Sequence, residues 1–365
     1  MRTKSILFRV DASILTGSGH VMRGLTLAEE LRNAGVDVGF VTRKHDGNLN
    51  GLIRSKGFQI FELPVGQQTN IGDGARGVYA QWLGASQQED ARETIEAMDG
   101  LRPEWLIVDH YAIDEQWEQL VRPHVSRIMV IDDLADRKHD CDILLDQNYV
   151  VGKEDRYKGL VPPSCTTLLG PHYALLRKEF AEAGALMRMR DGIVKRVFVF
   201  FGGVDPDNMT CKSLDALLDP ELSHLKVDVV LGSANPHRDK VRQLVERRPH
   251  TTFHVQVDTV AKLMASADLA LCAGGSSTWE RLSLGLPSLV VTIADNQVPF
   301  IRDLNNDGLL RWLGSSQNVD VVMIKSALKV ALMDSERNRQ ESEAGMLMVD
   351  GNGAVRVVQC IQLIS

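Results

Sequence analysis

Short apolar runs rich in β-branched residues alternate with helical patterns along this chain, and the alternation starts twice. The first series begins at Ser5–Val10 and the second at Arg196–Phe201. Such alternation is typical of βαβ units, which form parallel sheets with helices on both faces. A chain of 365 residues is also long enough for two domains of about 150 residues each. The sequence therefore predicts an α/β protein with two doubly wound, Rossmann-like sheets.

The two series place the expected elements. Val21–Ala34 carries apolar residues at helical spacing and is followed by Gly35, where a C-terminal cap belongs. The Gly- and Gln-rich stretch from Pro64 to Ser86 predicts a loop. The expected strands are Ser5–Val10, Val36–Thr42, Trp105–Val108, Arg127–Ile131 and Ile143–Leu145 in the first series, and Arg196–Phe201, Val227–Leu231, Thr252–Val255, Leu269–Cys272 and Ser288–Ile293 in the second.

The boundary between the predicted domains falls between Cys165 and Val194, and we place the domains at residues 1–175 and 176–365. The C-terminal stretch Ser335–Ile364 has a helical pattern. We expect its last helix to cross back to the first domain.

Composition argues against several classes of protein. A net charge of −7 is unlike that of a nucleic-acid binder, which needs a basic face. The five cysteines are scattered without a Cys-x-x-Cys pair, so we expect no disulfide framework, no zinc site and a cytoplasmic location. Arg9 and Asp11 break the N-terminal apolar run, unlike a signal peptide. No stretch reaches the ~20 apolar residues of a membrane helix.

A glycine-containing turn, Gly17-Ser18-Gly19-His20, follows the first predicted strand and opens the first predicted helix. Glycines let backbone amides approach a ligand closely, and a helix N-terminus favours negative charge. Dinucleotide binding would need a third glycine where Met22 stands, and an acid near the end of the second strand, where Thr42 and Arg43 stand. NAD is therefore not the expected ligand.

His20 allows two interpretations. As a general base it faces the crevice at the carboxyl end of its strand, and Asp11, at the end of that strand, could orient the imidazole. Otherwise His20 is a helix-capping or packing residue and Asp11 a solvated loop acid. The position of His20 beside the glycines favours the base.

A second small-residue loop, Cys272-Ala273-Gly274-Gly275-Ser276-Ser277-Thr278-Trp279-Glu280, joins a predicted strand to a predicted helix. Free amides of Gly275, Ser276 and Ser277, together with the hydroxyls, could wrap a diphosphate without a metal. The Glu280 carboxylate, one turn into the helix, could accept both ribose hydroxyls. Ser277 and Glu280 also match a capping box, which needs no ligand. The two glycines favour a ligand.

Three more groups of polar residues follow predicted strands: Ala294-Asp295-Asn296-Gln297, Asp109-His110-Tyr111 and Asp132-Asp133. The first offers more hydrogen-bonding side chains than a turn needs, although a turn alone remains the simpler interpretation. The adjacent acids could suggest a metal, but side chains of neighbouring extended residues point apart. We expect the acids Asp109, Asp132 and Asp133 to be solvated loop residues.

Eight short motifs follow one another in a specific order between about Phe8 and Ala354, which is nearly the whole chain. They are Gly17-Ser18-Gly19-His20 with Arg23, Val108-Asp109-His110-Tyr111, Ile131-Asp132-Asp133, Leu145-Asp146-Gln147-Asn148, Leu169-Gly170-Pro171 with Tyr173, Phe201-Gly202-Gly203 with Asp205, Ala273-Gly274-Gly275-Ser276 with Glu280, and Asp295-Asn296-Gln297. This series resembles the UDP-2,4-diacetamido-2,4,6-trideoxy-β-L-altropyranose hydrolases of pseudaminic acid biosynthesis. That family is similar to the glycosyltransferases of peptidoglycan precursors and shares their GT-B architecture, with two domains facing across a cleft.

The resemblance implies roles for residues of this chain. It makes His20 the catalytic base, places Asn296 by the sugar and makes Tyr111 an active-site residue. By similarity to the glycosyltransferases, the Gly-Gly-Ser loop of the second domain holds the diphosphate and Glu280 holds the ribose. The other expected substrate-binding residues are Gly17, Gly19, Arg23, Asp11, Gly203, Gly274, Gly275, Ser276, Ser277, Thr278 and Gln297.

The expected activity is hydrolysis of a UDP-sugar by a monomer without cofactor or metal. His20 takes a proton from the attacking water and the second loop stabilises the departing UDP. No carboxylate nucleophile is evident, so a single displacement with inversion is expected. Two alternatives stay open: a glycosyltransferase with the same donor site, and a nucleotide-sugar binding protein without turnover.

Overall fold

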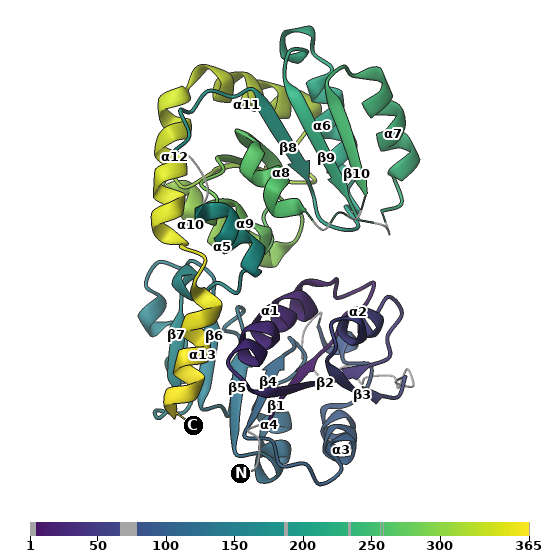
Figure 1. Ribbon diagram of the computed structural model, residues 1–365, viewed down its shortest axis with the longest axis vertical. Helices are drawn as coiled ribbons and strands as arrows, with labels where there is room; N and C mark the ends of the chain where they lie inside the picture. The colour runs from purple at the N-terminus through teal and green to yellow at the C-terminus, as the bar shows by residue number, and fades with distance from the viewer. Residues whose placement is uncertain are drawn as a thin grey trace. The chain divides into compact units, whose positions relative to one another are not determined.

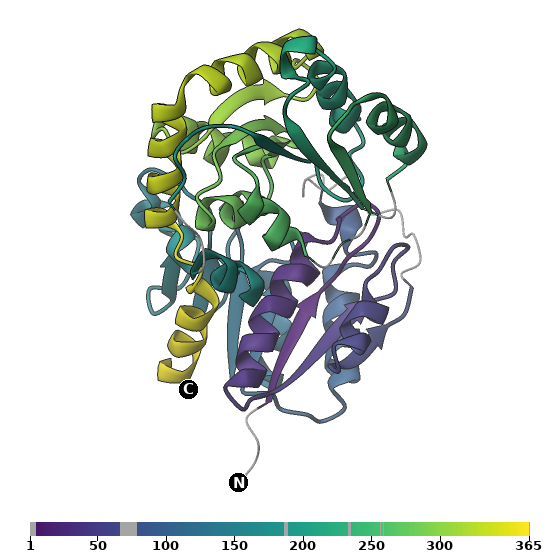
Figure 2. The same cartoon turned by 45° about the horizontal axis from the view of Figure 1, so that its top comes forward.

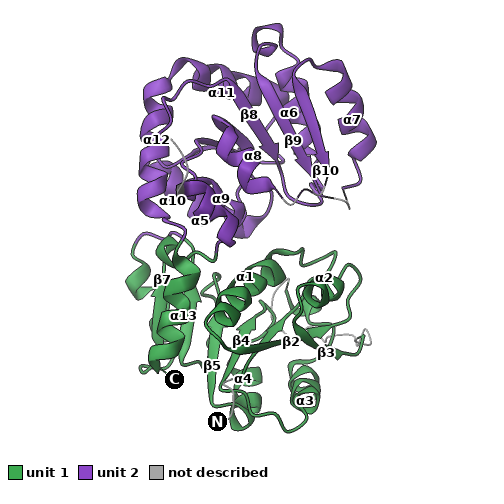
Figure 3. Ribbon diagram, in the orientation of Figure 1, with its two compact units in different colours: residues 1–148, 152–175, 352–365 green, residues 149–151, 176–351 purple. Residues whose placement is uncertain are grey.

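Two parallel sheets organise the chain, one in each of two units (Figure 1). In the computed structural model, unit 1 comprises residues 1–148, 152–175 and 352–365, and unit 2 comprises residues 149–151 and 176–351 (Figure 3). The structure describes residues 5–65, 79–185, 189–232, 235–255, 257 and 259–364. Helices flank each sheet, which confirms the predicted α/β class with two doubly wound sheets.

Unit 1 contains a seven-stranded parallel sheet in the order β3-β2-β1-β4-β5-β6-β7. The strands are β1 (Ser5–Val10), β2 (Asp37–Arg43), β3 (Gln59–Leu63), β4 (Trp105–Asp109), β5 (Arg127–Ile131), β6 (Ile143–Asp146) and β7 (Thr166–Leu169). The α-helices are α1 (Gly19–Asn33), α2 (Asn50–Ser55), α3 (Gln87–Met98), α4 (Glu115–Val121) and α13 (Gly353–Ile364). Short 3-10 turns are η1 (Ala80–Trp82), η2 (Arg122–His124), η3 (Lys153–Asp155) and η4 (Pro171–Tyr173).

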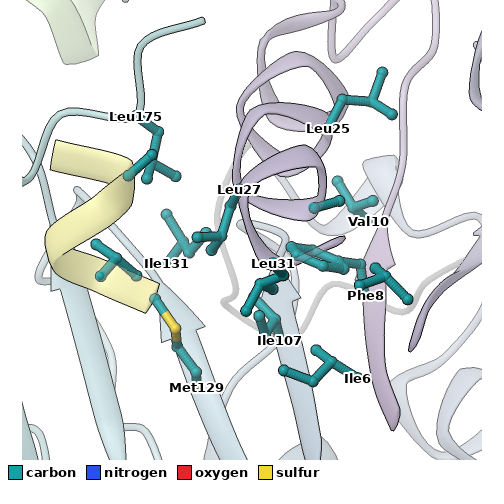
Figure 4. Packing of buried hydrophobic residues seen from close by; sticks show 14 of the residues in the cluster. Ile6, Phe8, Val10, Leu25, Leu27, Leu31, Ile107, Met129, Ile131 and Leu175 are labelled. Atoms are coloured by element: carbon teal, nitrogen blue, oxygen red, sulfur yellow. The ribbon is translucent and has the colours of Figure 1, made fainter. Parts of the chain in front are cut away.

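Apolar side chains pack on both faces of this sheet. On one face, Leu27 and Leu31 of α1 lie against the side chains of the central strands, including Phe8 and Ile107 (Figure 4). Helix α13 completes this layer beside α1, although the two are at opposite ends of the sequence (Figures 1 and 2). Helices α3 and α4 cover the other face, where Trp117 is fully buried. Burial on both faces explains why the central strands are continuous apolar runs.

Unit 2 contains a six-stranded parallel sheet in the order β10-β9-β8-β11-β12-β13. The strands are β8 (Arg196–Phe200), β9 (Lys226–Leu231), β10 (Thr251–Val255), β11 (Leu269–Ala273), β12 (Ser288–Thr292) and β13 (Arg311–Ser315). The helices are α5 (Lys178–Ala185), α6 (Met209–Leu217), α7 (Arg238–Arg247), α8 (Val260–Ser266), α9 (Ser277–Ser283), α10 (Val298–Asn306), α11 (Val321–Met333) and α12 (Ser335–Met348), with 3-10 turns η5 (Pro220–Leu222) and η6 (Asp295–Gln297).

The sequence analysis missed the strands β3, β7 and β13, and all three lie at sheet edges. An edge strand is exposed along one side, so it need not be a continuous apolar run. The predicted loop from Pro64 to Ser86 holds η1, and its residues 66–78 lie outside the described residues. The helical stretch Ser335–Ile364 is two helices, α12 and α13. Within the described ranges, no helix has the length and apolar character needed to span a bilayer.

A buried charge cluster joins β1, β2 and α3. Asp90 of α3 accepts hydrogen bonds from Arg9 Nε (3.0 Å) and Nη2 (2.6 Å), from Arg43 Nη2 (2.6 Å) and from Trp117 Nε1 (3.0 Å). Arg9, Arg43 and Asp90 are almost fully buried. Burial alone would raise the pKa of Asp90, but the two guanidiniums hold it below its ordinary value. The charge of Asp90 thus compensates buried cations of two neighbouring strands.

We predict that Asp90→Asn lowers the free energy of unfolding by about 3–5 kcal/mol, because it leaves buried guanidiniums without this partner. Urea denaturation at pH 7 measures the loss. Since the folded-state pKa of Asp90 is lowered, its stabilisation is complete above the ordinary carboxyl pKa of about 4 and is lost as pH falls below it. The difference between the two proteins should therefore shrink in acid.

Glu96→Gln is the matched control, because Glu96 lies on the same helix but pairs with Arg92 in solvent. Its stability should stay near that of the wild type. Equal losses in both variants would contradict the role assigned to Asp90.

Candidate functional site

Each sheet has one point where its strand order reverses, between β1 and β4 in unit 1 and between β8 and β11 in unit 2. The connections from the two central strands lead to opposite faces there and leave the carboxyl ends of the strands uncovered, which is where open α/β sheets bind ligands. The connection from β1 leads to His20 in the first turn of α1, and the connection from β11 to α9 contains Gly274 and Gly275. The two predicted glycine loops thus lie at these two points.

His20, in the first turn of α1, contacts the carboxylate that ends β4. Its Nδ1 lies 2.6 Å from Asp109 Oδ1. A carboxylate only accepts hydrogen bonds, and this contact is much shorter than the 3.2 Å from Arg23 Nη2 to the same Nδ1. We therefore assign the ring hydrogen to Nδ1, which leaves the lone pair of the neutral ring on Nε2. Nε2 has no hydrogen-bond partner within the residues that the structure describes, and it is not among the buried unpaired atoms. An imidazole held in this tautomer can take a proton at Nε2.

Arg23 fixes Asp109 from its other side. Arg23 Nε donates to Asp109 Oδ2 (2.5 Å) and Nη2 donates to Oδ1 (2.7 Å), while Nη1 donates to Asp133 Oδ2 (3.0 Å). Burial by itself raises the pKa of Asp109, but Arg23 and His20 together hold it well below its ordinary value. Asp109 therefore stays ionised, and the anion that orients His20 is itself held in place.

Aromatic rings pack beside His20. The Tyr111 ring meets it edge-on with centroids 4.6 Å apart, and Trp82 lies at 6.2 Å. Tyr79 contacts both Trp82 and Tyr111. The Tyr111 hydroxyl donates to Asp133 Oδ1 (2.5 Å), and burial together with Asp133 raises the pKa of Tyr111 well above its ordinary value. Sequence reasoning missed Tyr79 and Trp82, because a loop pattern does not show which of its side chains turn toward the strand ends.

The prediction that the acids after β4 and β5 are solvated is wrong for Asp109 and Asp132, which are fully buried. Asp132 forms an ion pair with Arg137 (2.9 Å) and accepts a hydrogen bond from the Tyr157 hydroxyl (3.1 Å). Central strands are covered on both faces, so their last residues are still inside the protein and need buried partners. Across the described ranges, no group of three or more His, Cys, Asp or Glu side chains could hold a metal ion.

Asp11 is also not the residue that orients His20. Its carboxylate forms an ion pair with Arg9 (2.8 Å) and accepts the backbone N–H of Arg43 (2.7 Å). Nε2 atoms of His45 and His110 lie 3.6 Å and 3.5 Å from Asp11 Oδ2. Asp11 therefore connects the end of β1 to β2. The carboxylate beside His20 is instead that of Asp109, which ends β4, the neighbour of β1 on the side opposite to β2.

The connection between β1 and α1 depends on Gly17, which has φ +72° and donates its N–H to Ser13 O (2.9 Å). A Cβ added at Gly17 or Gly19 would meet no atom of the other described residues within 4 Å, apart from the neighbouring backbone. The space where a side chain would begin is thus unoccupied at both glycines, as close approach of a ligand to the backbone requires.

In unit 2 the loop after β11 passes close to α10. A Cβ on Gly274 would lie 2.8 Å from the Ile301 side chain, so the close packing there favours glycine. Gln297 lies beside the loop, with its Oε1 3.4 Å from that Cβ position and its Nε2 3.8 Å from the one on Gly275. Gln297 Oε1 accepts the N–H of Ile293 (2.9 Å). The structure thus brings Gln297 to the Gly-Gly loop, and Asn296 is exposed beside it in η6.

Ser276 precedes α9, and Ser277 and Thr278 begin it. Both of these hydroxyls accept hydrogen bonds from the buried Arg281, at 2.9 Å for Ser277 Oγ and 3.0 Å for Thr278 Oγ1. Sequence reasoning missed Arg281. Its spacing of three and four residues from the two hydroxyls on one helix was an available sign of contact.

Glu280, in the same helix, has Oε1 3.4 Å from Arg177 Nη2. Burial raises the pKa of Glu280, against the opposing effect of Arg177. The capping-box alternative is not what the structure shows. Ser276 is the N-cap, and within the described residues no side-chain hydrogen bond joins Ser277 to Glu280.

Gly203 follows β8, the other central strand of unit 2. A Cβ on Gly232 would lie 2.4 Å from Gly203 O, which shows that the loops after β8 and β9 are in contact. A Cβ on Gly203 would meet none of the described residues within 4 Å. Asp205 then caps α6 by accepting the N–H groups of Met209 and Thr210, both at 2.9 Å. This cap fixes the direction in which the chain leaves the strand end.

No protein-family model matches the chain. The sequence is 27% identical over 294 residues to the UDP-2,4-diacetamido-2,4,6-trideoxy-β-L-altropyranose hydrolase of Campylobacter jejuni, an alignment that covers 80% of this chain and 93% of that protein. It is also 27% identical over 289 residues to an uncharacterised protein of Methanocaldococcus jannaschii. That alignment covers 77% of this chain and 54% of the archaeal protein, so the chain spans about half the length of this relative.

Among solved structures, MurG of Acinetobacter baumannii matches with a TM-score of 0.68 at 12% identity, over 99% of both chains. This match confirms the predicted fold class. The chain therefore has the GT-B fold, and its similarity to the Campylobacter hydrolase confirms the resemblance drawn from its motifs.

Proposed function

We propose that this protein hydrolyses a UDP-sugar, releasing UDP and the free sugar. The observation that carries the proposal is the His20–Asp109 pair at the strand ends of unit 1, in which Nε2 of the imidazole has no hydrogen-bond partner among the described residues. The sequence similarity to the Campylobacter hydrolase supports a UDP-linked 2,4-diacetamido-2,4,6-trideoxy-hexose as the substrate. Release of that sugar is a step in pseudaminic acid biosynthesis by the same resemblance.

In the proposed reaction a water molecule attacks the anomeric carbon. The bond from that carbon to the phosphate oxygen breaks, its electron pair stays on the departing UDP, and a proton of the water passes to His20 Nε2. Asp109 stabilises the imidazolium that forms, since an adjacent anion favours the charged ring. One displacement without a covalent intermediate inverts the anomeric centre.

Unit 2 provides the nucleotide site in this proposal. The amides after Gly274 and Gly275, with Ser276, Ser277 and Thr278, hold the diphosphate, and fixed dipoles of this kind stabilise a leaving anion without reorganising. Glu280 accepts the two ribose hydroxyls, for which it must exchange its 3.4 Å contact with Arg177. Gln297 lies at this loop with an amide group able to donate, and Asn296 contacts the sugar.

The remaining proposed contacts lie in unit 1 and after β8. The Tyr111 hydroxyl already donates its hydrogen to Asp133, so we assign Tyr111 a packing role: its ring lies beside the reacting carbon. Arg23 acts through Asp109. The open backbone at Gly17, Gly19 and Gly203 allows the substrate to approach closely.

A glycosyltransferase is the second candidate, because the fold matches that of MurG. It would use the same nucleotide site but transfer the sugar to an acceptor. Phosphorus NMR of the protein with the UDP-sugar and no acceptor separates the candidates. A hydrolase releases free UDP, whereas a transferase and a binding protein without turnover leave the UDP-sugar intact.

We predict that His20→Ala lowers kcat by ~10²–10⁴ while UDP affinity stays near the wild-type value, as expected for loss of a general base. Asp109→Asn should also lower kcat, because it removes the anion that sets the tautomer. His224→Ala, which changes an exposed histidine of unit 2, is the control and should be fully active. Turnover of His20→Ala within a few-fold of wild type would contradict the assignment.

We predict that Glu280→Ala weakens UDP binding about tenfold or more, since the ribose hydroxyls lose a charged acceptor. It should also flatten the preference for UDP over 2′-deoxy-UDP. Calorimetric titration of both nucleotides measures these effects. If Glu280 serves only the fold, the variant keeps its UDP affinity and melts at a lower temperature without ligand.

We predict that turnover survives exhaustive EDTA treatment, because the proposed steps assign the base to His20 and the leaving-group charge to the loop of unit 2. The release of UDP before and after chelation is the measurement. Loss of activity that magnesium or manganese restores would contradict this prediction.

A further inference from the structure

Arg281 is a buried cation whose hydrogen-bond acceptors are all neutral. Its side chain donates from Nε to Ser288 Oγ (3.1 Å), from Nη1 to Ser277 Oγ (2.9 Å), and from Nη2 to Thr278 Oγ1 (3.0 Å) and Ala273 O (3.2 Å). Only 1% of the residue is exposed. Within the described ranges of the chain, it forms no ion pair. The adjacent Glu280 carboxylate interacts with Arg281 electrostatically but forms its ion pair with Arg177. A buried charge without a direct ion-pair partner is costly, so its position needs a reason.

Two other buried arginines of unit 2 have compensation that Arg281 lacks. Arg311 forms an ion pair with Glu341 (2.8 Å). Arg248 donates to main-chain carbonyls, including that of Leu217 at the C-terminal end of α6, where the helix dipole is negative. The guanidinium of Arg281 instead contacts the first two residues of a helix, where the dipole adds positive potential. The field around it would be balanced by an anion.

The same hydrogen bonds determine what the two hydroxyls can do. A guanidinium only donates, so Ser277 Oγ and Thr278 Oγ1 act as acceptors toward Arg281. Each hydroxyl therefore keeps its own hydrogen for another acceptor. Neither hydrogen has an acceptor in the part of the chain that the structure describes. Two oriented donors, and one cation without an ion-pair partner among the described residues, thus lie in α9, directly after the loop that follows β11.

We propose that Arg281 is a positioning residue for the diphosphate: it orients the Ser277 and Thr278 hydroxyls to donate to phosphate oxygens and supplies a positive charge beneath them. This inference rests on the proposed function, in which the loop of Gly274 and Gly275 holds the diphosphate of UDP. Arg281 reaches the ligand through the two hydroxyls, and its charge offsets the charge that develops on the departing UDP.

The test compares UDP with uridine, which lacks the phosphates, by calorimetric titration of Arg281→Met. UDP affinity should fall about ten- to a hundredfold, the range for lost charge-assisted hydrogen bonds. Uridine affinity should be unchanged. Arg281→Lys retains the charge but cannot reach all four acceptors, so its UDP affinity should be intermediate. Thr278→Val should also weaken UDP binding, and combining it with Arg281→Met should give less than the sum of the two losses.

Arg248→Met is the matched control, since Arg248 is also a buried arginine of unit 2 but donates its hydrogen bonds to residues outside the loop after β11. It should lower the melting temperature and leave the UDP-to-uridine affinity ratio unchanged. The same behaviour in Arg281→Met, or in Arg281→Lys should the methionine variant not fold, would overturn the proposal. Titration with pyrophosphate distinguishes failure of this proposal from failure of the proposed function. Wild-type protein that binds pyrophosphate through Arg281 but does not bind UDP would refute the proposed function and keep the anion site.

Discussion

In a parallel sheet the carboxyl ends of all strands lie at the same end of the sheet. Where the strand order reverses, the helices that follow the two central strands lie on opposite faces, and part of this end is left uncovered. Both sheets of this protein have such a reversal, between β1 and β4 and between β8 and β11. His20, Asp109 and the Gly274–Gly275 loop all lie next to one of these two points. The chemistry that we propose depends on this constraint, because it brings residues from distant parts of the sequence to the same strand ends.

The buried charges at the two strand-order reversals differ in how they are compensated. Asp109 in unit 1 is an anion saturated by partners, with Arg23 on one side and His20 on the other. Such a group is preorganised before any ligand arrives, which suits the orientation of a base. Among the described residues, Arg281 in unit 2 donates only to neutral acceptors, and in the role that we propose for it the bound diphosphate balances its charge. Preorganisation of the base and a charge reserved for the leaving group are complementary requirements of one displacement.

The errors of the sequence analysis have physical causes. Asp109 and Asp132 follow apolar runs and were expected in solvent, but a central strand lies between two helical layers and its last residue is still buried. The strands β3, β7 and β13 were missed because edge strands lack the continuous apolar run that identified the central ones. Asp11 is near His20 in sequence, yet its carboxylate belongs to the cluster of Arg9 and Arg43.

The sequence by itself determined the central strands, the two glycine loops and the candidacy of His20 and Glu280, since apolar periodicity and glycines act over a few neighbouring residues. It could not show that Asp109, 89 positions away, orients His20, nor that the buried Arg281 donates only to neutral acceptors among the described residues. Burial and ion pairing depend on which strands become neighbours and which helices cover them. Only the tertiary structure decides that, because the order of strands in a parallel sheet differs from their order in the chain.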